Sequence, residues 1–329
     1  MSPFDEQLVN ELKELEPKLI SYLKTPNVPT NNIIAHIIQS GGKRVRPGLF
    51  LLCCDLLGYQ DEHRHPIAAV CEYIHTASLL HDDVIDNSPQ RRGKPTVGSL
   101  WGDETAVLAG DLIYSAACRL MVKTGSLELI DTFAECIRFM SESELYQLQL
   151  LWKIDTTTDE CLRVVEGKTA YLFGAACQTP AFLAQQSKDT SDALFAFGTS
   201  LGFCFQIADD CLDYAPESGT LGKPALSDAF EGKVTLPLIL ALRTLSGTGR
   251  NFIEAILSGN EPRTEENQRA LQDLVVSHGG VSQALEYADK RAADSFAALE
   301  RLTNKQNNID VRVLEKLADV LRYTSSRKK

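Results

Sequence analysis

Apolar residues recur at spacings of three and four along almost the whole chain, and this pattern most constrains the fold. The spacing places apolar side chains on one face of an α-helix, whereas a half-buried strand alternates with a period of two. We find no convincing alternating stretch. The pattern predicts helices at residues 4–24, 31–39, 47–58, 64–87, 103–124, 126–152, 159–186, 189–215, 235–246, 264–278, 281–303 and 309–325. Since linkers rich in Gly, Ser or Pro are few, we expect an all-α fold, a single-domain bundle of roughly ten or more helices spanning residues 1–329.

Composition and charge narrow the class of protein. The net charge of −11 argues against a broad basic surface for nucleic acid. No CxxC pair occurs among the nine cysteines, so we interpret them as reduced core residues of an intracellular protein. The cysteines placed in apolar helical context are Cys53, Cys54, Cys118, Cys161, Cys177, Cys204 and Cys211. The acidic N-terminus does not suit a transit or signal peptide, and no apolar run approaches the ~18 residues of a membrane span. We therefore expect a cytoplasmic location and no transmembrane segment.

The acidic pattern DDxxD occurs twice, each time at the end of an apolar predicted helix. Its carboxylates are Asp82, Asp83 and Asp86 in the first copy and Asp209, Asp210 and Asp213 in the second. Residues four apart share a helix face, where like charges repel, and the C-terminal end of the helix dipole also disfavours anions. A divalent cation such as Mg²⁺ would compensate both effects. The simpler interpretation is a pair of solvated acidic helix ends, but the repetition of the pattern favours a metal site. We expect Asp83 and Asp210 to orient ligands or basic partners from behind.

Basic residues complete the candidate site. The segment GGKRVRP carries Lys43, Arg44 and Arg46, and the segment QRRG directly after the first acidic motif carries Arg91 and Arg92. Arginine and lysine suit phosphate oxygens, so the combination predicts a polyanionic ligand bridged by metal. Lys168 lies in EGKTAYLF, and the irregular segment Ala215–Pro237 carries Lys223 and Lys233. We expect Arg44 and Lys223, taken singly, to be exposed solubilising charges.

The sequence closely resembles the trans-type polyprenyl diphosphate synthases. The motifs GGKRVRP, DDVID with its RRG, GKT and FQIADDCLDY occur here in that family's order, and the resemblance extends to GKVTLPLI. It implies an isoprenoid-synthase fold around a central catalytic cavity and a homodimer. It also implies a Mg²⁺-dependent condensation of isopentenyl diphosphate with an allylic diphosphate.

The resemblance carries the following roles onto the matching positions. It implies metal binding by Asp82, Asp86, Asp209 and Asp213, and binding of isopentenyl diphosphate by Lys43, Arg46, His75 and Arg92. It implies contacts to the allylic substrate from Arg91, Lys168, Thr169, Gln206 and Lys233. His81 is interpreted as an ordinary core histidine.

Product length is predicted from the residues one helical turn before Asp82. Ala77 and Ser78 are small, whereas short-chain relatives place a bulky aromatic floor near this position. We therefore expect a long-chain synthase, hexaprenyl to decaprenyl with octaprenyl favoured. Phe133 is a candidate for a deeper floor, although it is more simply interpreted as a core phenylalanine.

Several other functions were weighed. A short-chain farnesyl or geranylgeranyl diphosphate synthase would share the motifs. A class I terpene cyclase would not need the two basic segments, and a noncatalytic subunit of a heteromeric synthase would lose Asp82, Asp86 or Arg91, which are present. A structural cation-buffering protein would not need cations beside its carboxylates. A di-iron bundle would need Glu-x-x-His pairs, and Glu142 and Glu144 have none.

Overall fold

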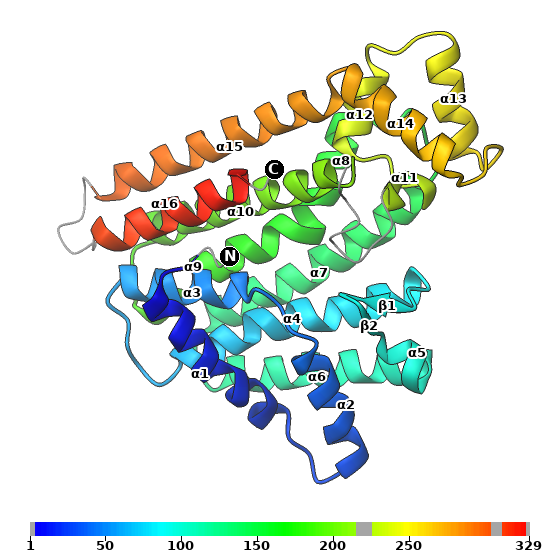
Figure 1. Cartoon of the computed structure of the whole chain (residues 1–329). Helices are drawn as coiled ribbons and strands as arrows, with labels where there is room; N and C mark the ends of the chain where they lie inside the picture. Colours follow the sequence, from blue (N-terminus) through cyan, green and yellow to red (C-terminus); the bar gives the residue numbers. More distant parts are fainter. Residues whose placement is uncertain (1–3, 215–225, 304–310, 327–329) are drawn as a thin grey trace. The chain divides into compact units, whose positions relative to one another are not determined.

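The computed structural model describes residues 4–214, 226–303 and 311–326 and is almost entirely helical (Figure 1). Its helices are α1 (Glu6–Leu23), α2 (Val28–Gln39), α3 (Val45–Leu56), α4 (Arg64–Ile85), α5 (Val97–Trp101), α6 (Asp103–Val122), α7 (Leu127–Leu150), α8 (Thr158–Val165), the π-helical turn η1 (Glu166–Ala170), α9 (Tyr171–Leu183), α10 (Lys188–Leu212), α11 (Ser227–Phe230), α12 (Leu236–Leu242), α13 (Thr248–Leu257), α14 (Glu265–Ser277), α15 (Gly280–Thr303) and α16 (Val311–Ser326). The strands β1 (Gln90–Arg91) and β2 (Lys94–Pro95) form one antiparallel hairpin. The predicted all-α class is confirmed.

Each predicted helix is present, with ends that differ by a few residues. Polar side chains fix several starts: Asp5 accepts a hydrogen bond from the Leu8 N–H, and Thr157 with Glu160 forms a complete capping box. The predicted helix at 159–186 is continuous through α8, η1 and α9, but its middle is a π turn. The short helices α5 and α11, the helix α13 and the hairpin were not predicted. Four or five residues are too few to establish a helical period.

The chain divides into two compact units. Unit 1 comprises Met1–Ile137, Leu172–Ala196 and Leu299–Val320, and unit 2 comprises Arg138–Tyr171, Phe197–Ala298 and Leu321–Lys329. Organisation as one domain over residues 1–329 stays a prediction.

Unit 1 is centred on α3 and α4. α3 is buried along nearly its whole length, and α4 packs against α6. At Gly110 on α6 the His81 ring of α4 lies so close to the backbone that any larger side chain would collide with it. The His81 Nε2 atom lies 3.2 Å from the Val107 carbonyl oxygen, so His81 acts as a packing residue between α4 and α6.

In unit 2 the second half of α10 packs along α15. The Cys204 thiol donates to the Ala288 carbonyl, and the Ser295 hydroxyl donates to the Phe197 carbonyl. α12 also contacts α8 and α14. The helix that ends in the second acidic motif is therefore anchored by α15.

The cysteines are all free, and eight of the nine are buried as expected. The prediction for Cys118 was wrong, because its side chain is exposed on α6. Its apolar neighbours in sequence belong to both faces of the helix, so composition alone did not reveal which face it occupies.

α6 is also long and apolar enough, by length and hydropathy alone, to cross a membrane, and it is the one described helix that meets this test. It buries one side, including Ala106, Ile113 and Ala117, within unit 1. The core helix of a folded protein passes the same test, so the buried side accounts for part of this apolar character.

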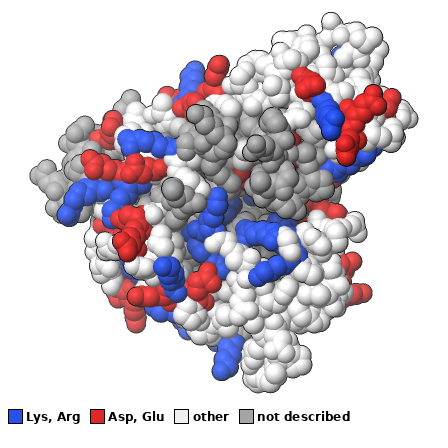
Figure 2. Space-filling model, viewed as in Figure 1, with Lys and Arg blue, Asp and Glu red and all other residues white. Residues whose placement is uncertain are grey.

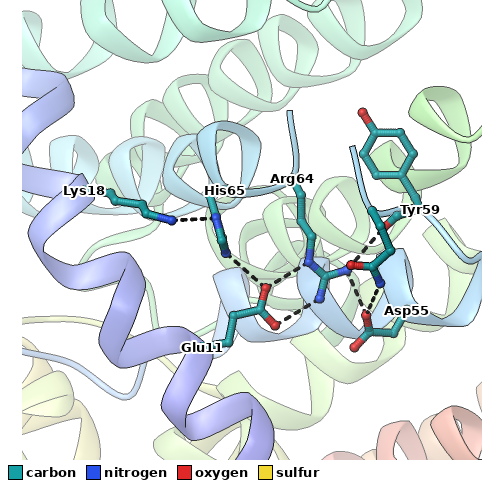
Figure 3. Close-up of polar contacts among 7 residues, drawn as sticks. Glu11, Lys18, Asp55, Tyr59, Arg64 and His65 are labelled. Atoms are coloured by element: carbon teal, nitrogen blue, oxygen red, sulfur yellow. Dashed lines mark hydrogen bonds and ion pairs between the residues drawn. The ribbon is translucent and has the colours of Figure 1, made fainter. Parts of the chain in front are cut away.

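A polar network joins α1 to α3 and α4 (Figure 3). The Arg64 guanidinium lies 2.9 Å from Glu11 Oε1 and 2.8 Å from Asp55 Oδ1. The His65 Nε2 atom lies 3.1 Å from Glu11 Oε1, and its Nδ1 lies 2.8 Å from the Lys18 amine. Burial alone would raise the pKa of Glu11, but hydrogen bonds and charges from His65 and Arg64 outweigh it and lower the pKa to about 2. The carboxylate therefore stabilises the folded state.

We expect Glu11→Gln to lower the free energy of unfolding by about 2 kcal/mol at neutral pH, because Arg64 loses a charged partner. The folded pKa lies below the unfolded value, so this contribution is present at neutral pH and fades as pH falls. The gap from wild type should narrow between about pH 4.3 and pH 2. Urea denaturation at several pH values measures it. Glu14→Gln, which removes the same charge from an exposed position on α1, should show no such gap.

Candidate active site

The first acidic motif lies at the C-terminal end of α4. Asp86 caps the helix, and its N–H donates to the Asp82 carbonyl at 2.8 Å, which keeps the two residues one turn apart. Asp83 is buried, and its Oδ1 lies 2.7 Å from both Nε and an Nη of Arg91. The expectation that Asp83 orients a basic partner from behind agrees with this contact.

The RRG segment forms the turn of the β1–β2 hairpin. Arg92 and Gly93 have φ values of 52° and 74°, the left-handed backbone that a two-residue hairpin turn requires. An Arg92 Nη atom donates to the Gly41 carbonyl. A Cβ added to Gly42 would lie 2.8 Å from this same Arg92 nitrogen. The glycine pair therefore lets the two basic segments meet. Figure 2 shows Lys and Arg side chains gathered where Figure 1 draws α4 and this hairpin.

Arg44 is buried, and the prediction of an exposed charge was wrong. Its guanidinium lies 2.5 Å from Glu72 and 2.7 Å from Glu16, and it donates to the Ile38 carbonyl. Burial alone would lower the pKa of Arg44, but the two carboxylates more than reverse this and raise it. Its φ of 49° turns the chain into α3. Arg44 therefore fixes the segment that carries Lys43 and Arg46.

Arg46 and His75 lie among the cations of unit 1. The Arg46 guanidinium stacks on the Phe173 ring at 4.5 Å, and burial lowers its pKa to about 10. Its buried Nε has no hydrogen-bond partner among the described residues. Burial, followed by the charges of Arg46, Arg92, Arg91 and Arg44, lowers the pKa of His75 well below its usual value. An anion would satisfy this group of cations.

The residues predicted to control chain length also lie in unit 1. Ala77 and Phe133 are fully buried, while Ser78 is half-buried and donates its hydroxyl to the His75 carbonyl. Their roles stay predictions.

Unit 2 carries the second acidic motif. The Asp213 N–H donates to the Asp209 carbonyl at 3.3 Å, which continues the helical spacing past the end of α10. Asp210 is buried behind them. Burial, followed by repulsion from Asp228, raises the pKa of Asp210 well above its usual value, with smaller contributions from Asp209 and Asp213.

Asp228 was missed by the sequence analysis. Its N–H donates to the Asp213 Oδ2 at 3.2 Å, so the turn around α11 places a further carboxylate beside the motif. Asp228 lies fifteen residues after Asp213, in a segment without helical period, and its only sequence signal was that long irregular segments tend to be functional.

The π turn η1 places Lys168 and Thr169. The Lys168 amine lies 2.6 Å from Glu144 and 3.2 Å from Gln147, both on α7. The Thr169 hydroxyl donates to Gln206 Oε1, and the Gln206 amide donates to Asp210 Oδ1, each at 2.8 Å. The structure thus joins two predicted site residues, Thr169 and Gln206, to the second acidic motif. A single π turn within a helix is often found at functional sites.

Lys233 also belongs to unit 2, where its amine lies 2.9 Å from Glu231 and its N–H donates to the Asp228 carbonyl. Lys223 lies outside the described residues.

The donor set suits a hard divalent cation, because each acidic motif supplies carboxylate oxygens one helical turn apart. Among the described residues, no group of three or more His, Cys, Asp or Glu side chains gathers closely enough to hold a metal alone. Mg²⁺ commonly takes one or two carboxylates and completes its coordination with substrate phosphate oxygens and water. The residues therefore fit a cation that binds together with a diphosphate.

Comparisons with known proteins agree with this arrangement. The family model for polyprenyl synthetase matches residues 28–275. The octaprenyl diphosphate synthase of Escherichia coli is 35% identical over 270 residues, which cover 78% of this chain and 84% of the relative. The chain belongs to the polyprenyl synthetase family, and it is a prenyltransferase.

Solved structures show the same fold. The decaprenyl diphosphate synthase of Rhodobacter capsulatus superposes with a TM-score of 0.90 at 32% identity, over 98% of both chains. A polyprenyl synthase of Caulobacter crescentus, complexed with calcium and isoprenyl diphosphate, gives 0.89 at 32% identity over the whole of both chains. The resemblance found in the motifs is therefore confirmed.

We expect Gly167→Ala to lower the free energy of unfolding by about 1–3 kcal/mol and to reduce kcat, because the added Cβ would overlap the Ser143 hydroxyl. The overlap would shift η1 and with it Lys168 and Thr169. Thermal unfolding and steady-state kinetics measure both effects. Ser143→Ala alone should be nearly neutral, since its buried hydroxyl has no partner among the described residues, and it should partly rescue Gly167→Ala. Equal losses in both backgrounds would contradict this explanation.

We also expect the His75 imidazole to be neutral at neutral pH and to titrate below the usual value of about 6.5. Inorganic diphosphate should raise this pKa, because the anion offsets the surrounding arginines. NMR titration of the imidazole protons measures the change, and His75→Gln assigns the resonance. A pKa that does not move at saturating diphosphate would place the anion elsewhere.

Proposed function

We propose that this chain condenses isopentenyl diphosphate head to tail with an allylic diphosphate and makes a long-chain all-trans polyprenyl diphosphate, with octaprenyl favoured. The observation that carries the proposal is the repeated DDxxD motif at the ends of α4 and α10, with each copy hydrogen-bonded to a residue predicted to contact the allylic substrate. The names of the relatives, an octaprenyl and a decaprenyl diphosphate synthase, support the product class.

The proposed cofactor is Mg²⁺, held by Asp82 and Asp86 at the C-terminal end of α4 and by Asp209 and Asp213 at the C-terminal end of α10. The calcium and isoprenyl diphosphate bound by the Caulobacter relative support a divalent cation. When bound, the metal would neutralise charge developing on the diphosphate leaving group.

The chain's own side chains have distinct proposed tasks. Lys43, Arg46, His75 and Arg92 bind isopentenyl diphosphate. Burial, followed by the charges of nearby arginines, lowers the pKa of His75, and this group of cations supports an anion-binding site. Arg91, Lys168 and Lys233 bind the allylic diphosphate. Thr169 and Gln206 present oxygen atoms to the allylic cation, and their mutual hydrogen bond supports a fixed orientation for both.

The assembly and location are also proposals. Leu108, Val122 and Leu127 are each at least 65% exposed on the α6–α7 side of unit 1. Burying such a surface against a second copy is favourable, which supports a homodimer. A cytoplasmic location suits the reduced cysteines.

The test is to incubate the protein with Mg²⁺, labelled isopentenyl diphosphate and farnesyl diphosphate, and to resolve the dephosphorylated products by length. We expect a ladder that ends in the long-chain range. Asp82→Asn should lower kcat/KM by roughly a thousandfold, because a lost metal ligand removes several kcal/mol of charge stabilisation. Wild-type product that stops one condensation after the primer would favour a short-chain synthase. No incorporation with any primer would favour a noncatalytic subunit.

Ser78→Phe tests the basis for product length in the same assay. We expect a shorter product with initial isopentenyl turnover retained, because the aromatic ring would obstruct the growing chain. Ser21→Phe, an exposed position on α1, is the matched control and should leave the ladder unchanged.

A further inference from the structure

Trp152 is one of the two tryptophans of the chain, and no part of the proposed reaction uses it. It follows the end of α7 with a φ of 66°, the left-handed backbone that an aromatic residue rarely adopts. Its side chain is 48% exposed, so burial in a core does not account for this conformation. Such a conformation persists where the surrounding contacts hold it in place.

The contact that holds Trp152 is with Gly232, the residue before Lys233. The Trp152 N–H donates to the Gly232 carbonyl at 2.8 Å. The indole covers the Gly232 backbone so closely that a Cβ there would lie 2.5 Å from the indole Cε2. Gly232, with a φ of 82°, supplies both the turn and the space.

The turn covered by Trp152 is continuous with the second acidic motif. The Lys233 N–H donates to the Asp228 carbonyl at 2.8 Å, and the Asp228 N–H donates to the Asp213 Oδ2. Three successive hydrogen bonds thus connect Trp152 to Asp213, a proposed metal ligand. The first of them is to Gly232, the residue next to Lys233, a proposed diphosphate ligand.

α7 and the residues that follow it thereby support both Lys168 and Lys233. Glu144 and Gln147 in the helix contact Lys168, and Trp152, two residues beyond the helix end, contacts the turn before Lys233. A displacement of that turn would change the separation of Lys233 from Lys168, and both must reach oxygens of one diphosphate group.

We propose that Trp152 is a positioning residue, which fixes the Gly232 turn so that Lys233 is aligned for the allylic diphosphate. The inference rests on the proposed function. Trp152 acts through Lys233, so its loss should weaken diphosphate binding only as far as Lys233 contributes to it.

The test uses Trp152→Asn, because asparagine tolerates left-handed backbone and retains the N–H while removing the indole. We expect the dissociation constant for inorganic diphosphate with Mg²⁺, measured by calorimetry, to rise about tenfold, the effect of one impaired charge-assisted hydrogen bond. KM for the allylic substrate should rise similarly, while KM for isopentenyl diphosphate should stay within about twofold of wild type.

A double-mutant cycle with Lys233→Ala separates this role from general destabilisation. If Trp152 acts through Lys233, Trp152→Asn should have little further effect on diphosphate binding once Lys233 is removed. Equal losses in both backgrounds, or unchanged binding in the single variant, would overturn the proposal. Trp152→Phe, which retains an aromatic ring, serves the same comparison if the asparagine variant does not fold.

Trp101→Phe is the matched control, since Trp101 is similarly exposed but lies on α5 in unit 1, and it should bind diphosphate as wild type does. It also leaves Trp152 as the sole tryptophan, so a change in indole fluorescence on adding Mg²⁺ and diphosphate would report the turn directly. A wild-type protein that binds no diphosphate would instead contradict the proposed function and leave no role for the alignment of Lys233.

Discussion

Repulsion between like charges is the constraint on which both candidate ligand clusters depend. In unit 1 burial, and then the charges of four arginines, lower the pKa of His75; in unit 2 burial, and then the charges of three neighbouring carboxylates, raise the pKa of Asp210. Other contacts hold each cluster in place. The β1–β2 hairpin and the end of α4 hold the arginines of unit 1, and α15 and the π turn η1 hold the carboxylates of unit 2. A ligand of opposite charge would relieve this repulsion, which is the physical basis of the proposed binding of metal and diphosphate.

The fold was largely predictable because helical periodicity is a local property of the sequence. α1 and α7 each bury a stripe that recurs every three or four residues, so their existence and type follow from spacing alone. α11 and the hairpin depend on tertiary contacts and on backbone conformation at single residues, and spacing carries no such information. The π turn within 159–186 could not be predicted from spacing either, because one inserted residue shifts the register of a helix without interrupting its apolar pattern.

The candidate site was predictable where a motif combines unusual charges, and less so where a residue acts through a neighbour. Asp82, Asp86, Asp209 and Asp213 stand out in the sequence because local physics opposes their grouping. Arg44 does not stand out from Arg46, and only the structure shows that Glu16 and Glu72 enclose it. Asp228 and Trp152 are brought to the site by a turn that joins distant residues. The only sequence signal for Asp228 was the long irregular segment around it, and Trp152 had none.

The enclosure of Arg44 has a consequence for comparing sequences. Among the described residues, Arg44 is the one buried cation that contacts both Glu16 and Glu72, so changing it alone would leave the buried Glu72 carboxylate without a cation, whereas exchanging all three for apolar residues of similar volume can be tolerated. Positions 16, 44 and 72 should therefore vary together among related chains while Lys43 and Arg46 respond to the ligand. Adjacent residues of GGKRVRP are then under two independent kinds of selection: Arg44 for the fold, and Lys43 and Arg46 for the chemistry.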